Sequence, residues 1–147
     1  MKALLAFFLL SFVAVVSHAQ DAGHTSAVLD NFGDLMSKGN IAKIDGLFDD
    51  KATVYWVDKK LYGKSPLLKF LRHQSDAAEK YELSFSPDDG IEDGKISTSW
   101  GTFAINYGTP GGQISNQLLG RYTVVAKNVD DKWIIVSLHL SSPRFSN

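Results

Sequence analysis

The sequence has no cysteine, and it has no excess of charge of either sign. Without cysteine the chain can form neither a disulfide nor a thiol nucleophile. The 15 Lys and Arg residues balance 16 Asp and Glu residues, and no basic block stands out, so we expect no nucleic-acid partner. The four histidines, at positions 18, 24, 73 and 139, lack the close spacing of metal ligands, and we expect neither a metal nor a cofactor.

An apolar run from Ala3 to Val16 follows a single charge at Lys2, and residues 17–19 offer the small side chains that signal peptidase reads. The run is shorter than the roughly 20 residues that a membrane span needs. We therefore expect residues 1–19 to be a signal peptide that is cleaved after Ala19. Residues 20–147 would then form a single secreted or periplasmic domain without a membrane partner. A retained membrane anchor is the alternative interpretation of the same run.

The strongest fold signal is the stretch from Gly120 to Ser142. Two apolar, β-branched runs, residues 121–129 and 132–140, flank Asp130-Asp131, which is typical of an antiparallel hairpin with a tight turn. A two-residue turn pairs Val129 with Lys132 and Ala126 with Ile135. Continued without interruption, this register places Tyr122 opposite His139 on the face that carries Trp133.

The same register divides the hairpin into two largely apolar faces. The protein's own helices are expected to cover one of these faces. A second subunit is expected to cover the other face, so the sequence predicts a homodimer. The candidate interface residues on that second face are Val125, Ile134, Val136, Leu138 and Leu140.

The rest of the chain divides into helices first and strands afterwards. Helical spacing of apolar residues predicts a helix over residues 25–38, a short one after Asn40, and a third that is opened by Ser65 and Pro66. A strand over residues 52–57 separates the second helix from the third. Further strands are expected over residues 81–86, 95–107, 113–129 and 132–140. Three helices around one strand, followed by an antiparallel meander, indicate an α+β fold.

Three segments carry a resemblance to a known family: SKGNIAKIDGLFDDKATVYW, LYGKSPLLKFL and GRYTVVAKNVDDKWIIVSLHLSS. Together with the element order they resemble the nuclear transport factor 2-like superfamily, and within it the SnoaL-like and ketosteroid-isomerase-like branch. The resemblance implies a cone-shaped, curved antiparallel sheet wrapped around three N-terminal helices, an apolar pocket between them, and frequent dimerisation through the outer face of the sheet. Because the superfamily includes isomerases, cyclases, dehydratases and non-enzymes, the fold does not select an activity.

The isomerase comparison turns on two positions. Ketosteroid isomerases have an oxyanion-hole tyrosine on the first helix and a general-base aspartate in the first strand, and the matching positions here are Phe32 and Trp56. A phenyl ring cannot donate a hydrogen bond, and an indole cannot act as a base. The resemblance therefore disfavours ordinary ketosteroid isomerisation and implies an aromatic, dry pocket. Whether the protein is an enzyme stays open.

The polar candidates are His139, Tyr122 and Asp58. His139 has the side chain best suited to acid and base chemistry near neutral pH, and the predicted register puts Tyr122 beside it. Asp58 is the carboxylate nearest to Trp56 in the sequence. These three are the candidate catalytic residues. The alternative is a structural histidine that Tyr122 or the backbone satisfies.

The candidate ligand-binding residues are mostly aromatic, because aromatic walls give contact area with few polar demands. Core packing is the alternative role for these rings. The set is Phe32, Trp56, Trp100, Phe103, Tyr107, Tyr122 and His139.

One leading hypothesis and two alternatives follow. We expect an exported, homodimeric domain that binds a small apolar or aromatic molecule without catalysing a reaction. The first alternative is an isomerase, cyclase or dehydratase with His139 as its acid or base, which requires that ring to reach the pocket. The second is a protein-interaction module whose pocket is vestigial.

Overall fold

The computed structural model describes residues 23–77, 80–108 and 114–143, so the predicted signal peptide lies outside the described residues. The helical segments are α1 (Gly23–Ser37), α2 (Ile41–Ile44), the short 3-10 helix η1 (Asp45–Leu47) and α3 (Lys64–Asp76). The strands are β1 (Phe48–Trp56), β2 (Lys59–Tyr62), β3 (Lys80–Asp93), β4 (Ile96–Gly108), β5 (Ile114–Val129) and β6 (Lys132–Ser141). No helix in these ranges is both long and apolar enough to cross a membrane.

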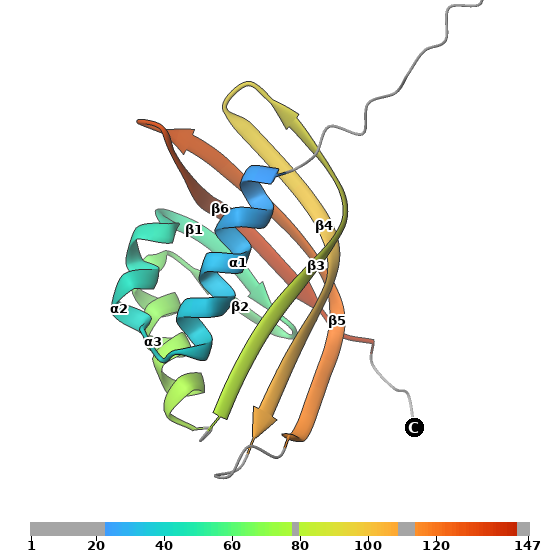
Figure 1. Cartoon of the computed structure of the whole chain (residues 1–147). Helices are drawn as coiled ribbons and strands as arrows, with labels where there is room; N and C mark the ends of the chain where they lie inside the picture. The colour runs from blue at the N-terminus through green and yellow to red at the C-terminus, as the bar shows by residue number, and fades with distance from the viewer. Residues whose placement is uncertain (1–22, 78–79, 109–113, 144–147) are drawn as a thin grey trace, which may run out of the picture.

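The strands form one curved, unclosed sheet, and the helices lie together on its concave side (Figure 1). The strand order is β2-β1-β6-β5-β4-β3, and β1 runs parallel to β6 while every other pair is antiparallel. The predicted α+β cone is therefore confirmed. The helices shield the concave face, and the convex face of the described sheet has no helix over it.

Helix α1 packs directly on β3. Its apolar stripe is buried as the spacing predicted, with Leu29, Phe32 and Met36 fully covered. Gly33 lies so close to the sheet that a Cβ there would be 2.5 Å from the carbonyl oxygen of Leu83. Ser37 reinforces this contact, because its Oγ donates to the Gly33 carbonyl at 2.8 Å and accepts from the Leu83 amide at 3.3 Å.

Several predicted boundaries differ from the structure. Residues 59–62, expected as loop, form the edge strand β2, and β1 begins four residues earlier than predicted. Helix α3 begins at Lys64, one residue before the predicted cap, and no side chain caps it. The sequence Asp88-Asp89-Gly90 follows the strand predicted over residues 81–86 but lies inside β3 at a β-bulge, so β3 is one long bent strand that continues to Asp93.

The hairpin between β5 and β6 has the predicted turn and a different register beyond it. Asp130 and Asp131 have φ values of 50° and 62°, as a type I′ turn requires, and Val129 pairs with Lys132. The register then shifts, since Ala126 pairs with Ile135 but Val125 pairs with Ser137. Val136 is the extra residue of this β-bulge.

This bulge makes the predicted pairing of Tyr122 with His139 wrong. Tyr122 pairs with Leu140, and His139 pairs with Thr123. A one-residue slip exchanges the faces of all later side chains. Leu138 and Leu140 are consequently fully buried in the core rather than on the outer face, while His139 is exposed on the convex face.

Candidate functional site

A cluster of aromatic rings fills the concave side of the sheet. Phe32 of α1 is at its centre, edge-to-face with Trp56 at 6.3 Å between ring centroids and stacked on Phe85 at 6.2 Å. Trp56 in turn contacts Phe70 of α3 at 5.6 Å between ring centroids, and Phe85 contacts Tyr122 at 5.3 Å. Phe32 has no exposed surface and Trp56 has 4%. The positions matching the isomerase base and oxyanion donor are thus filled by packed rings.

One cavity reaches this cluster from outside. It has a volume of about 290 Å³ and lies between the β1–β2 turn, α3 and the adjoining parts of β4 and β5. We call it the Trp56 pocket, and its lining residues are Trp56, Val57, Asp58, Lys59, Phe70, Gln74, Tyr107 and Leu118. Ligand pockets start at about 300 Å³, so this one suits a molecule with a single ring.

The Trp56 pocket contains three of the predicted site residues, Trp56, Asp58 and Tyr107. Sequence reasoning missed Phe70 and Leu118 as pocket residues. Phe70 belongs to the predicted apolar stripe of the third helix, so that stripe was the available signal. No sequence signal marked Leu118 as a pocket residue, because residues 117–119 lack the alternation of apolar and polar side chains that separates the two faces of a strand.

Polar groups surround an apolar floor in this pocket. The Lys59 ammonium lies 4.9 Å from the centroid of the Phe70 ring, a cation–π contact at the rim. Tyr107 packs edge-to-face on Tyr81 at 5.4 Å, and burial raises the pKa of both hydroxyls. Both therefore stay protonated and neutral at physiological pH. The pocket offers one carboxylate, one ammonium, one carboxamide and a neutral phenol around the rings of Trp56 and Phe70.

The rim of the Trp56 pocket includes a strained residue. Val57 has φ 60°, the left-handed region that β-branched side chains rarely adopt. Its amide donates to the Leu140 carbonyl at 2.9 Å, which holds the turn in this conformation. Such a conformation costs about 1–3 kcal/mol and is frequent at binding and catalytic sites. The strain therefore supports the Trp56 pocket as the candidate site.

The other predicted site residues lie elsewhere. His139 is exposed on the convex face, edge-to-face with Tyr55 at 5.5 Å. Trp100 is half-buried on that same face, opposite Thr123. Phe103 and Tyr122 are 2% exposed in the core. Burial raises the pKa of Tyr122, which its proximity to Ser99 only partly offsets. The structure thus separates His139 from both Tyr122 and Asp58.

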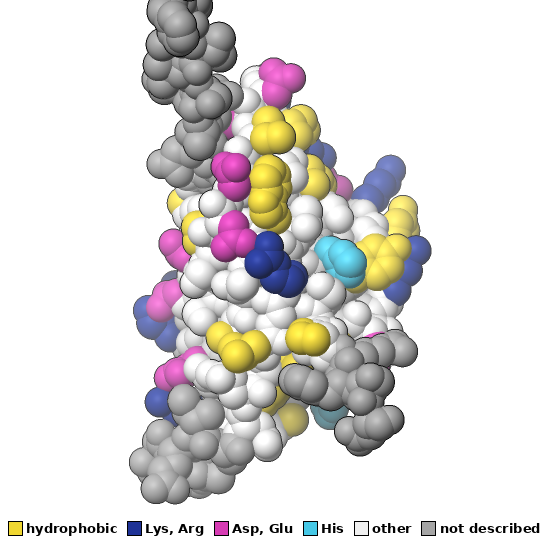
Figure 2. All heavy atoms as spheres, turned by 90° about the vertical axis from the view of Figure 1, so that its right-hand side faces the viewer, with side chains coloured by type: hydrophobic (Ala, Val, Ile, Leu, Met, Phe, Trp, Pro, Cys, Tyr) yellow, Lys and Arg dark blue, Asp and Glu magenta, His cyan; other side chains and the backbone are white. Residues whose placement is uncertain are grey.

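The predicted interface residues divide between the core and the convex face. Leu138 and Leu140 are in the core, as described above, because of the bulge. Val125, Ile134 and Val136 are half-buried and retain some accessible surface. Figure 2 shows the convex face, where hydrophobic side chains are spread among polar ones rather than joined in one large patch.

Another cavity, of about 820 Å³, lies beside α2 and α3 and is a weaker candidate. Its lining is mostly charged, and Leu68 is its single apolar residue. The Lys64 ammonium is 2.8 Å from Asp50 and 3.6 Å from Asp45, so these charges largely neutralise each other. Within the described ranges, no group of three or more His, Asp and Glu side chains is placed to hold a metal ion.

Comparisons with known proteins agree on the fold. The solved structure of a nuclear transport factor 2-like superfamily protein from Salmonella enterica serovar Typhimurium aligns with a TM-score of 0.72 at 16% identity, covering 86% of this chain and 93% of that one. A protein from Novosphingobium aromaticivorans, provisionally assigned as a scytalone dehydratase, aligns with a TM-score of 0.70 at 11% identity, covering 82% and 83%. A Shewanella oneidensis protein of unknown function aligns at 0.66 and 13%, covering 82% and 98%.

At these identities the structural matches establish the fold alone, and comparison with curated proteins yields no match. The family model for the SnoaL-like domain, however, matches residues 26–144, which is most of the chain. This protein therefore belongs to the SnoaL-like domain family, with the nuclear transport factor 2-like fold.

Proposed function

We propose that the chain binds a small apolar or aromatic molecule in the Trp56 pocket and does not catalyse a reaction there. The observation that carries this proposal is the position of Trp56. Its indole packs between Phe32 and Phe70 and also lines the pocket. A pocket with the edge of an indole in its floor gives a ring an apolar contact, but it puts no base where the isomerases have one.

Catalysis by His139 receives no support from the geometry. That hypothesis required the imidazole to reach the pocket, and the ring lies on the opposite side of the sheet. Asp58 does line the pocket, but no described histidine or second carboxylate lines it with Asp58. Export and homodimerisation remain part of the proposal, the first from the predicted signal peptide and the second from the uncovered convex face.

Filling the Trp56 pocket is expected to abolish binding of a small neutral aromatic probe. Leu118→Trp adds an indole to the pocket wall, so we expect the affinity for indole to fall about tenfold or more, measured by chemical-shift titration of the Trp56 side-chain N–H. The matched control is Leu119→Trp, because Leu119 is the next residue in β5 and is 54% exposed on the convex face. Equal indole affinities in the two variants would contradict the proposal.

The homodimer is expected to depend on the centre of the convex face. Trp100→Asp should weaken dimerisation by about 2–4 kcal/mol if this half-buried ring becomes fully buried between subunits. Sedimentation velocity across a concentration series measures this, with Tyr62→Asp at the sheet edge as the control. A wild-type monomer, or a Trp100→Asp dimer as tight as wild type, would contradict homodimerisation through this face.

A further inference from the structure

A second cleft lies on the helix side of the β5–β6 hairpin. It has a volume of about 410 Å³ and is enclosed by α1, by the segment from α2 to η1, and by the beginning of β6. We call it the Trp133 cleft. None of its lining residues lines the Trp56 pocket. Along β6, Trp133 is seven residues from Leu140, the partner of Trp56, which corresponds to a separation of about 23 Å.

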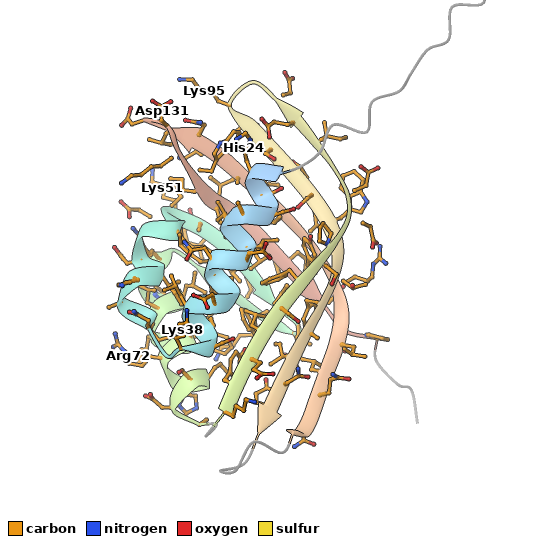
Figure 3. All side chains as sticks on the ribbon, in the orientation of Figure 1. His24, Lys38, Lys51, Arg72, Lys95 and Asp131 are labelled. Carbon is orange, nitrogen blue, oxygen red and sulfur yellow. The ribbon has the colours of Figure 1, made fainter. Side chains whose placement is uncertain are left out.

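One wall of the Trp133 cleft is a stacked pair of rings. The His24 imidazole lies 4.8 Å from the Trp133 indole between centroids, and the two planes differ by 19°. His24 is at the first turn of α1 (Figure 3), and its Nδ1 is 2.7 Å from a carboxylate oxygen of Glu92 on β3. This hydrogen bond fixes the imidazole, so the half-buried indole is held in place as a flat wall.

The opposite side of the cleft is apolar, and its rim is cationic. Val28 and Leu47 supply partly buried aliphatic surface. Lys43 and Lys132 line the cleft, and neither ammonium has an ion-pair partner among the described residues. No carboxylate is among the residues that line the cleft. Glu92, which is hydrogen-bonded to His24, lies outside it. Two uncompensated cations therefore stand beside an aromatic wall.

We propose that the Trp133 cleft binds a planar aromatic carboxylate of one or two rings. The indole and imidazole match a flat ring by stacking, and the aliphatic wall covers its second face. The two ammonium groups supply charge-assisted hydrogen bonds to the carboxylate. This site is independent of the proposed function, because it shares no residue with the Trp56 pocket and requires an anion rather than a neutral molecule.

The test is a titration of the full chain with 2-naphthoate, followed by calorimetry and by amide and indole N–H chemical shifts. We expect saturable binding with shifts centred on Trp133. The double variant Lys43→Gln and Lys132→Gln should weaken binding about tenfold or more, as the loss of charge-assisted hydrogen bonds predicts. The neutral 2-naphthylmethanol should bind the wild type more weakly by a similar factor.

The matched control is Lys95→Gln. Lys95 lies at the same end of the molecule as His24 (Figure 3) but does not line the cleft. Its variant should bind 2-naphthoate like the wild type. The lysine variants change exposed side chains, so they test the proposal even if Trp133→Ala fails to fold. An unchanged affinity in the double variant, or no saturable binding, overturns the proposal. Shifts confined to Trp56 also overturn it, while leaving the Trp56 pocket proposal intact.

Discussion

Gly120→Ala is expected to destabilise the protein by about 3 kcal/mol, the upper part of the usual range for overpacking a core. A Cβ at Gly120 would overlap the Ser141 carbonyl oxygen and lie 2.5 Å from the Phe103 ring. Phe103 is the residue paired with Gly120 across β4 and β5, and it is 2% exposed. The ring can occupy this space only because the neighbouring strand has no side chain there. Urea denaturation measures the effect as a lower unfolding midpoint.

Gly46→Ala is the control for this prediction. No heavy atom lies within 4 Å of the place where its Cβ would be, and the residue is exposed in η1. Its free energy of unfolding should change by no more than about 0.5 kcal/mol, as is usual for surface substitutions. Equal urea midpoints for Gly120→Ala and Gly46→Ala would contradict the close approach of Phe103 to β5.

Phe32→Ala is expected to reduce the free energy of unfolding by about 3–5 kcal/mol. Its ring has no exposed surface and contacts Phe48, Trp56 and Phe85, so truncation leaves a cavity among rigid rings that cannot collapse easily. The same variant should also loosen Trp56 and weaken indole binding at the Trp56 pocket. Denaturation and titration of one preparation measure both effects.

Asn31→Ala provides the comparison for Phe32→Ala. Asn31 is the preceding residue of α1 and is exposed, so its substitution should change stability by no more than about 0.5 kcal/mol. A small effect of Phe32→Ala, close to that of Asn31→Ala, would mean that the aromatic cluster contributes little to the core. In that case the position matching the isomerase tyrosine would be free for another role.

The helices and the final turn were predictable because their signals are local. The apolar stripe of α1 follows helical spacing, and Asp130-Asp131 lies between two β-branched runs. The curved sheet comes from the family resemblance, and the parallel β1–β6 pairing was not predicted, since no local pattern specifies which distant strands pair. The edge strand β2 was missed because Lys59–Tyr62 is short and begins with two lysines, which is typical of a loop as well as of an edge strand.

The candidate site was predicted less well than the fold, and the reason is the bulge at Val136. Residues 134–136 are uniformly apolar, so no alternation marks the point at which the register shifts. Because of this slip, His139 lies on the convex face instead of the concave one. Leu138 and Leu140 lie in the core instead of on the convex face. Asp58, Trp56 and Tyr107, which line the Trp56 pocket, lie outside this hairpin segment and are not affected by the slip.

The parallel pairing of β1 with β6 also governs when the molecule can fold. Val54 pairs with Leu138, so the ladder joins segments that are separated by roughly eighty residues. Until β6 has been synthesised, β1 has only the four-residue strand β2 as a partner within the described sheet. Closing so large a loop is slow compared with hairpin formation, and native structure therefore arrives late. The native sheet is therefore completed only when β6, the last described strand, takes its place between β1 and β5.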